Sequence, residues 1–288
     1  MAELRTLVQP DDLHAAAAFQ EHPAFGAQPI RFAQPALVAL AQNGGLVLGA
    51  YTNDDLVGLS ISFLGTDVSD PKRPAMANLK MVTTFLGVHP DAREDVAFDL
   101  LLGQRAYATR QGIRLITWTI DPLNAAYADL SLHQLGAITG EFVADYYGTD
   151  GHPQSAADRL VIEWWVTNRR VEERLTGRRM QLGLDQYLDG NATVINPSQP
   201  GEPWPQPEPL HSMGEATMLL LEIPFEFGAL HVDVPELAAA WRDHVRGALR
   251  TLLSEGYIIT DFVQGSWQGR PRSFYVLSLA PRGFFSAS

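Results

Sequence analysis

The segment Gly87–Pro122 reads GVHPDAREDVAFDLLLGQRAYATRQGIRLITWTIDP, and it decides the fold class. The apolar, β-rich run 81–88 predicts a strand. Pro90 and Asp91 end this strand, because proline cannot donate to a β-ladder and aspartate favours turns and helix caps. A helix follows, and the run 115–120 predicts a second, buried strand. This order of strand, turn, helix and strand is typical of the place where a nucleotide-like ligand meets a parallel sheet.

The helix in this segment has a regular apolar face. Its members recur at helical spacing and are Val96, Leu100, Gly103 and Tyr107. Gly112 stands where a left-handed C-terminal cap is expected, because glycine adopts a positive φ without a Cβ penalty. The local pattern therefore predicts one buried face and a defined end for this helix.

Apolar periodicity and turn residues predict further elements on both sides of this segment. The predicted strands are 5–8, 46–51, 56–63, 141–147, 159–166, 217–223, 257–263 and 273–279. The predicted helices are 11–19, 32–42, 124–135 and 233–256. We expect Asp233 and Glu236 to cap the last of these helices. The charged region 168–177 is most simply a solvated helix or linker. The proline-rich passage 196–214 predicts an extended connector that Trp204 holds on the surface.

Several blocks occur in an order that resembles one enzyme superfamily. They are VHPDAR at 88–93, ITWTIDPLNAAYADLSLHQLGA at 116–137, DYYG at 145–148, DRLVIEWW at 158–165, LLEIPFEFGAL at 220–230 and RSFYVLSL at 272–279. The chain resembles the GNAT superfamily of acyl-CoA-dependent N-acyltransferases, and within it a bacterial branch with an added C-terminal segment. The resemblance implies an α/β (α+β) fold with a mixed sheet flanked by helices over 1–175. A connector over 176–214 and a smaller β-α-β-β segment over 215–288, packed on the sheet, complete the chain.

The resemblance also implies where an acyl-CoA binds. In the superfamily a backbone N–H of the strand before the phosphate turn holds the acyl carbonyl, and by position it belongs to Leu86 or Val88. Arg93 matches the arginine of the phosphate turn. Asn124 belongs to the block after the second strand and is a further candidate contact to the cofactor.

Two side chains are candidates for proton transfer. Members of the superfamily commonly place a tyrosine acid four residues before the glycine that closes the next helix, where this chain has Leu132. Tyr127 is therefore the candidate for the catalytic acid, and His133 lies nearby in the sequence. An alternative interpretation is that both residues are only partly buried residues of a helix. Asp121 is the candidate carboxylate for the amine, because substrates bind at the C-terminal ends of strands in open α/β sheets. A turn residue or helix cap is an equally good interpretation of Asp121.

The phosphate turn departs from the pattern of the superfamily. Its usual glycines let backbone N–H groups approach a pyrophosphate, whereas Glu94, Val96 and Phe98 stand here. Glu94 and Asp95 also place two carboxylates beside an anionic ligand, although acids in the first turn stabilise a helix as well. We therefore predict that an acyl-CoA binds weakly and without the usual cradle.

Composition excludes several classes of function. The chain has 288 residues and a net charge of −12, which argues against nonspecific binding to nucleic acid or to an anionic membrane surface. It contains no cysteine, and its histidines lack metal-ligand spacing, so neither a thiolate site nor a metal site is expected. No run is long enough to span a membrane, and the N-terminus does not read as a signal peptide, so a cytoplasmic location is expected.

Two hypotheses of function remain open from the sequence. The first is an N-acyltransferase that moves an acetyl or succinyl group from acetyl-CoA or another acyl-CoA to a small amine, such as an amino acid. The second is a noncatalytic GNAT-fold protein with an eroded CoA site that binds a small ligand or a protein partner. Weaker candidate carboxylates are Glu163, Asp145 and Asp261. The sequence leaves a homo-oligomer open.

Overall fold

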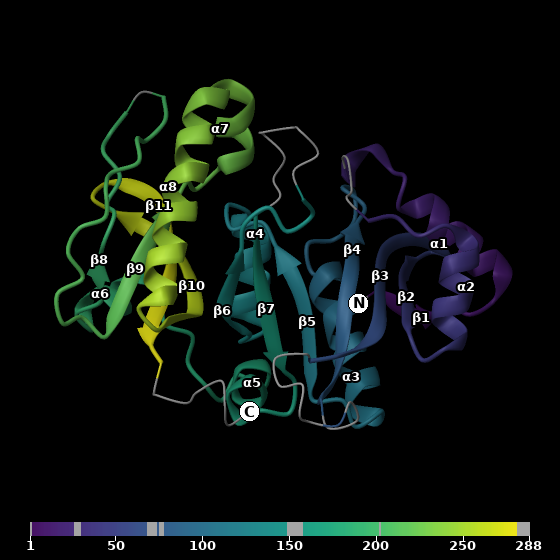
Figure 1. The fold of residues 1–288 in the computed structure, drawn as a ribbon. Coiled ribbons are helices and arrows are strands. Elements are labelled where there is room, and N and C mark those ends of the chain that lie inside the picture. Colours follow the sequence, from purple (N-terminus) through teal and green to yellow (C-terminus); the bar gives the residue numbers. More distant parts are fainter. Residues whose placement is uncertain are drawn as a thin grey trace. The chain divides into compact units, whose positions relative to one another are not determined.

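The computed structural model describes residues 2–25, 30–67, 74, 78–148, 158–201 and 203–280 (Figure 1). The chain forms two compact units, Met1–Trp118 with Trp165–Asn168, and Thr119–Trp164 with Arg169–Ser288. These divisions differ from the predicted domain boundaries at 175 and 214. The predicted domains stay predictions, because contacts define a compact unit whereas independent folding defines a domain.

The first unit contains a sheet with the strand order β1-β2-β3-β4-β5. The strands are β1 (Glu3–Thr6), β2 (Leu46–Thr52), β3 (Asp55–Thr66), β4 (Leu79–Val88) and β5 (Leu115–Ile120, whose last two residues belong to the second unit). Neighbouring strands from β1 to β4 pair antiparallel, and β4 pairs parallel with β5. The pairing confirms the predicted mixed sheet.

Helices flank both faces of this sheet. They are α1 (Pro10–Phe19), the short η1 (Pro23–Phe25), α2 (Gln34–Gln42) and α3 (Val96–Arg110). Leu59 and Ile61 of β3 pack in one apolar cluster with α1 and α2. Their neighbour Gly58 faces the opposite way, since a Cβ built on it would lie 2.7 Å from Val96 of α3. Gly112 follows α3 with a φ of +74°, as the sequence predicts.

A buried polar layer fixes α3 on the sheet. Gln104 of α3 donates from Nε2 to the hydroxyl of Ser62 at 2.6 Å and also to that of Ser60. The hydroxyl of Thr83 donates to Gln104 Oε1 at 3.1 Å. Because buried polar groups need these partners, the layer specifies how α3 is rotated against β3 and β4.

The second unit has the strand order β7-β6-β10-β11-β9-β8. Its strands are β6 (Ile138–Val143), β7 (Arg159–Trp165, whose last residue belongs to the first unit), β8 (Thr193–Val194), β9 (Met218–Ile223), β10 (Tyr257–Trp267) and β11 (Arg270–Leu279). Its helices are α4 (Ala125–Ala128), a π-helical turn η3 (Asp129–Gln134), α5 (Arg169–Leu175), α6 (Leu184–Asp189), α7 (Phe227–Asp233) and α8 (Pro235–Ser254).

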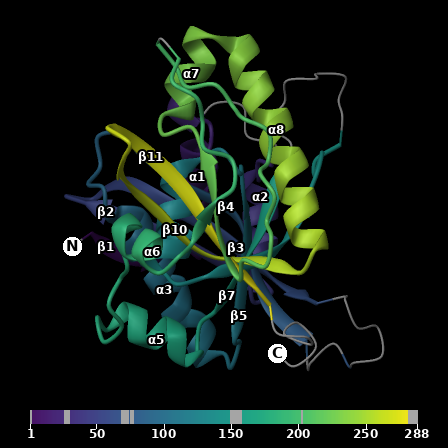
Figure 2. The same ribbon diagram turned by 90° about the vertical axis from the view of Figure 1, so that its left-hand side faces the viewer.

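The C-terminal segment packs against the strands that precede it. Ile259 of β10 pairs with Thr139 of β6, so the hairpin β10–β11 continues the sheet formed by β6 and β7. The long helix α8 lies along this sheet, as the two views in Figures 1 and 2 show, and contacts β6, β9 and β10. Trp241 and Leu249 of its predicted apolar face are fully buried. The predicted packing of the C-terminal segment is confirmed.

The ends of several elements differ from the prediction. The predicted strand 141–147 lies at Ile138–Val143, and the predicted helix 124–135 divides into α4 and the π-helical turn before Gly136. The hairpin extends to the pair Trp267 and Arg270, beyond the predicted strand ends at 263 and 273. Here the tight turn Gln268-Gly269, in which both residues have positive φ, closes the ladder.

Two predicted interpretations of charged residues are wrong. Asp233 and Glu236 do not cap the long helix; Val234 occupies the N-cap without a side-chain bond, and Asp233 ends α7. The region 168–177 is not simply a solvated helix, because Arg174 of α5 is buried.

The connector is held on the second unit at several points. Asn196 is fully buried; its amide accepts the N–H of Glu222 at 2.7 Å and donates to the carbonyl of Glu222 at 2.9 Å. Trp204 donates to the carboxylate of Asp233 at 3.2 Å, in line with its predicted role. The proline-rich passage is therefore a strap with defined contacts.

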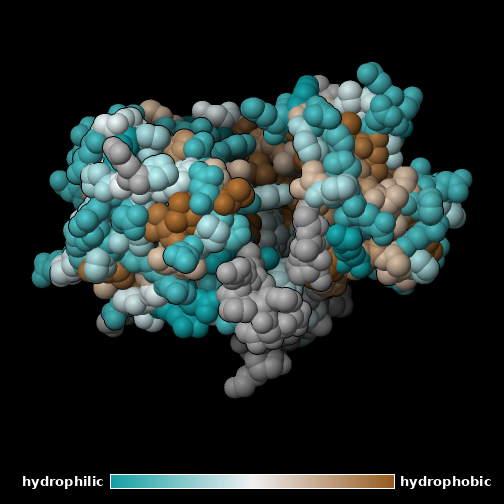
Figure 3. Space-filling model, turned by 90° about the horizontal axis from the view of Figure 1, so that it is seen from above, coloured by the Kyte–Doolittle hydropathy of each residue, from teal (hydrophilic) through white to brown (hydrophobic). Residues whose placement is uncertain are grey.

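Hydrophilic residues cover most of the face in Figure 3, with apolar residues in patches among them. None of the helices in the described part of the chain has both the length and the apolar character needed to cross a bilayer.

Candidate functional site

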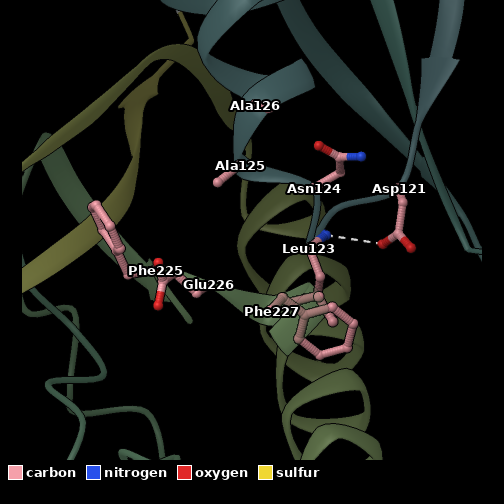
Figure 4. Close-up of a pocket in the computed structure, with 9 residues that line it drawn as sticks. Asp121, Leu123, Asn124, Ala125, Ala126, Phe225, Glu226 and Phe227 are labelled. Atoms are coloured by element: carbon pink, nitrogen blue, oxygen red, sulfur yellow. Dashed lines mark hydrogen bonds between the residues drawn. The ribbon is translucent and has the colours of Figure 1, made fainter. Parts of the chain in front are cut away.

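Asp121 directly follows β5 and belongs to the second unit, and both of its carboxylate oxygens are engaged. Oδ1 accepts the backbone N–H of Leu123 at 2.9 Å, which fixes the turn after the strand (Figure 4). Arg242 of α8 donates to Oδ2 at 3.0 Å and to Oδ1 at 3.3 Å. The two side chains are each 20% exposed. Asp121 is therefore a turn residue in an ion pair, and its predicted contact with an amine stays a prediction.

Asn124, and not Asp121, caps the following helix. Its side-chain oxygen accepts the N–H of Tyr127 at 3.1 Å, so α4 begins directly after it. Burial raises the pKa of the Tyr127 phenol, which keeps it protonated, the form that an acid needs. The roles predicted for Asn124 and Tyr127 toward a ligand stay predictions.

A pocket of about 330 Å³ opens beside this turn (Figure 4). One wall is formed by Asp121 and Leu123–Ala126, and the other by Phe225–Gly228, which lead from β9 into α7. Two segments about a hundred residues apart in the sequence thus line one pocket. Only the tertiary structure brings the second wall to the first.

The helix α8 carries two arginines one turn apart that fasten it to loops of the second unit. Arg242 binds Asp121, and Arg246 donates to Asp158 at 2.8 Å and to Asp145 at 3.1 Å. Asp145, a weaker candidate in the sequence, is thereby paired. Sequence reasoning missed both arginines; their spacing of four residues shows a shared helix face but not what that face meets.

The hydroxyl of Tyr275 on β11 also fixes the turn after β5. It donates to the carbonyl of Pro122 at 2.7 Å, and its side chain is fully buried. The C-terminal segment therefore determines the conformation of the loop that carries Asp121 and Asn124. The sequence did not predict this contact, because no local pattern links residues this far apart.

Leu132 and His133 serve the core of the second unit. Leu132 is fully buried, so no acid replaces the tyrosine at that position. His133 Nδ1 lies 3.0 Å from Oδ1 of Asp261, a buried carboxylate on a bulge of β10. Arg174 and Tyr187 donate to the other oxygen of Asp261 at 3.0 and 2.8 Å. Asp261 thus joins several elements of the unit and is engaged in structural contacts.

The strand β4 in the first unit presents two N–H groups away from its antiparallel partner. The N–H of His89, directly after β4, donates to Val57 beside β3 at 2.8 Å. Successive residues of a strand direct their N–H groups to opposite sides, so those of Leu86 and Val88 point toward the side of β5. Met81 and Val82 of β4 pair with Ile116 and Thr117 of β5. The role predicted for Leu86 or Val88 toward an acyl group stays a prediction.

The turn before α3 does not fit a pyrophosphate in the usual backbone cradle. Arg93 donates through Nε to Asp95 at 2.9 Å and makes a second short bond to the same carboxylate. Its Nη2 also lies 3.8 Å from Asp99. Val96 is buried against β3, and Glu94 is exposed. The arginine charge is thus balanced by protein carboxylates, and the turn carries side chains where the superfamily has glycines.

Within the described residues, no group of three or more His, Cys, Asp or Glu side chains is placed to hold a metal ion. The expectation that the protein has no metal site stays a prediction.

The first unit has a mixed α/β fold with helices on both faces of its sheet. Solved structures similar to this chain are N-acetyltransferases. The ribosomal-protein-S18-alanine N-acetyltransferase from Escherichia coli is 16% identical, with 58% of this chain and 96% of that chain covered and a TM-score of 0.43. NAA60 from Arabidopsis thaliana, in complex with a bisubstrate analogue, is 16% identical over 57% and 98%, with a TM-score of 0.46. An acetyltransferase of the GNAT family from Streptococcus pneumoniae is 13% identical over 57% and 98%, with a TM-score of 0.43.

No protein-family model matches the sequence, and no curated protein matches it.

Proposed function

We propose that this protein is an N-acyltransferase that transfers an acyl group, acetyl or succinyl, from an acyl-CoA to a small amine; amino acids are one such class. The observation that carries the proposal is the edge of β4, where the N–H group of Val88 points to the side of β5, away from β3. When bound, the acyl-CoA would supply an acyl group that is activated as a thioester.

The backbone of β4 would stabilise the negative charge that develops on the acyl oxygen in the transition state. An N–H that points at a carbonyl oxygen stabilises the negative charge that develops when an amine attacks, and a strand holds such a donor rigidly. This chemistry needs no side chain from β4. The amine loses a proton as the C–N bond forms, and the sulfur that leaves when the C–S bond of the thioester breaks takes up a proton; a carboxylate or a chain of waters suffices to carry it.

Replacement of the donor tests this role directly. Val88→Pro removes one N–H, and Val88→Ala is the matched control that keeps it. We expect Val88→Pro to lower the rate of acyl transfer by about a hundredfold, the usual effect of losing one oxyanion donor, and Val88→Ala to change it little. Product formation is measured by mass spectrometry with acetyl-CoA or succinyl-CoA and a panel of amines. Equal rates in the two variants, with equal melting temperatures, would place the acyl site elsewhere.

The turn before α3 favours a second candidate, a GNAT-fold protein without catalysis. Arg93 is occupied by Asp95, and Glu94 is exposed beside it, which disfavours a diphosphate. Under this alternative, the protein forms no product with any amine, and calorimetry detects no acetyl-CoA binding at millimolar concentration. The same assays thus separate the two candidates.

A further inference from the structure

We infer that the pocket between Asp121–Ala126 and Phe225–Gly228 binds a small organic cation, an amine with an apolar substituent and without a carboxylate. The pocket lies wholly within the second unit (Figure 4). Its volume of about 330 Å³ is at the small end of the range for ligand pockets. The inference narrows the amine of the proposed function, and in this respect it rests on that function.

The charges that line the pocket select the sign of the ligand. Asp121 is one of two charged side chains in the lining, and Arg242 already offsets its charge. Glu226 is the other; it is exposed, and among the described residues its carboxylate has neither an ion pair nor a side-chain hydrogen bond. The lining contains no lysine or arginine. A ligand therefore meets one unbalanced negative charge.

Asn124 is the third polar side chain of the lining, and its oxygen is committed to the protein. Asn124 uses its side-chain oxygen to cap α4 through the N–H of Tyr127. Its amide NH₂ can still donate, but one neutral donor does not balance a carboxylate that approaches Glu226. An α-amino acid would bring its own carboxylate into a lining without a cation, which costs free energy. An amine that lacks this group avoids the cost.

The aromatic side chains select an apolar substituent. Phe225 is 40% exposed at the pocket, although phenylalanine normally buries its ring. Phe227 is nearly buried, and one face of its ring packs against the guanidinium of Arg242. The guanidinium carbon lies 4.9 Å from the centroid of the ring. In Figure 4, Glu226 lies between these two rings in the view shown. An ammonium at Glu226 thus places its substituent against an aromatic surface.

Three probes of similar shape test the ligand class on the full-length protein without an acyl donor. 2-Phenylethylamine is the cation, L-phenylalanine adds a carboxylate, and 3-phenylpropionate is the anion. We expect calorimetry to detect the amine, to give at least about tenfold weaker binding for phenylalanine, and to detect no binding of phenylpropionate. Equal or tighter binding of phenylpropionate overturns the inference.

Variants locate the binding. Glu226→Gln should weaken the binding of 2-phenylethylamine by at least about tenfold, because it removes a charge-assisted bond. Glu236→Gln, an exposed change at the start of α8 outside the lining, is the matched control and should have no effect. Ala125→Trp should fill the pocket and abolish binding while circular dichroism stays unchanged. Unchanged affinity in Glu226→Gln or Ala125→Trp overturns the inference.

Failure of this inference can be told from failure of the proposed function. Acyl transfer to an amine with no measurable binding in this pocket would refute the inference alone. Binding of 2-phenylethylamine, lost in Glu226→Gln, with neither acyl-CoA binding nor acyl transfer, would refute the proposed function alone.

Discussion

Arg242 on α8 donates hydrogen bonds to both carboxylate oxygens of Asp121, at 3.0 and 3.3 Å. Asp121 lies 121 residues before Arg242 in the chain. Asp121 also fixes its own turn through the N–H of Leu123. The carboxylate that the sequence singles out for chemistry therefore has two structural partners. An amine that needs this carboxylate must share it with Arg242.

Asp121→Asn separates the structural role of Asp121 from a catalytic one. The asparagine oxygen can still accept the Leu123 N–H, so only the ion pair is lost; because the pair is partly exposed, we expect a loss of about 1 kcal/mol in the free energy of unfolding. If Asp121 also binds the amine, kcat/KM for acyl transfer falls by at least about tenfold. Wild-type kcat/KM in Asp121→Asn would show that Asp121 is a turn residue only. Asp185→Asn, on an exposed position of α6, serves as the control.

The charges beside the turn before α3 predict how the protein binds acetyl-CoA. Glu94→Gln removes one exposed carboxylate without a change of shape, and one such repulsion at about 4 Å in water is worth roughly 1 kcal/mol. We expect the variant to bind acetyl-CoA about fivefold more tightly in calorimetry at low salt, whereas Glu21→Gln leaves the Kd unchanged. A submicromolar Kd that is identical in wild type and Glu94→Gln would show that the phosphates bind elsewhere.

The buried carboxylate of Asp261 predicts a strong effect on stability. Its partner Arg174 is only 2% exposed, so Asp261→Asn leaves a buried cation without its counterion. We expect a loss of about 3–5 kcal/mol in the free energy of unfolding, measured by urea denaturation. Tyr187→Phe removes a single donor to the same carboxylate and should cost only about 1 kcal/mol. Similar losses in both variants would contradict this interpretation.

The same carboxylate predicts a dependence of stability on pH. Burial acts to raise the pKa of Asp261, but the hydrogen bond of His133 and the charge of Arg174 outweigh it, so the pKa in the folded protein is lowered. A lowered pKa stabilises the folded state above the unfolded pKa of about 4, and this contribution is lost as the pH falls toward the folded pKa. The difference in stability between wild type and Asp261→Asn should be full at pH 6 and shrink below about pH 4. A difference that grows as the pH falls would refute the sign of the shift.

The strap predicts where a protease cleaves the connector. Asn196 and Ser198 are buried, whereas His211, Ser212 and Gly214 are exposed, so within 196–214 we expect subtilisin to cut at 211–214. The two pieces should elute together in gel filtration until urea is added, because β10 pairs with β6 and Asp261 binds Arg174 across the cut. A soluble, folded fragment that starts near 215 and elutes alone would show that the C-terminal segment is an independent module.

Local sequence was sufficient for most strands and for the longer helices, in their order, but not for the short elements η1, α6, β8 and α7. The run of strand, turn, helix and strand from β4 to β5, the apolar face of α3 and the glycine that ends it were all predicted, because each depends on residues within one or two turns of each other. The strands and the long helix of the C-terminal segment were predicted for the same reason. The predictions were wrong where contacts with distant residues decide the local structure. Examples are the π-helical turn that holds His133 against Asp261 and the hairpin that extends to Trp267.

The candidate site shows what the tertiary structure alone decided. Asp121 and Asn124 stand out in the sequence, but Arg242 and the wall that contains Glu226 do not, since nothing local relates them to the turn after β5. Periodicity encodes which face of a helix or strand is buried; it does not encode which distant element covers that face. The pairing of α8 and β9 with the rest of the second unit depends on strand register, packing and the balance of buried charges, and these exist only once the chain is folded.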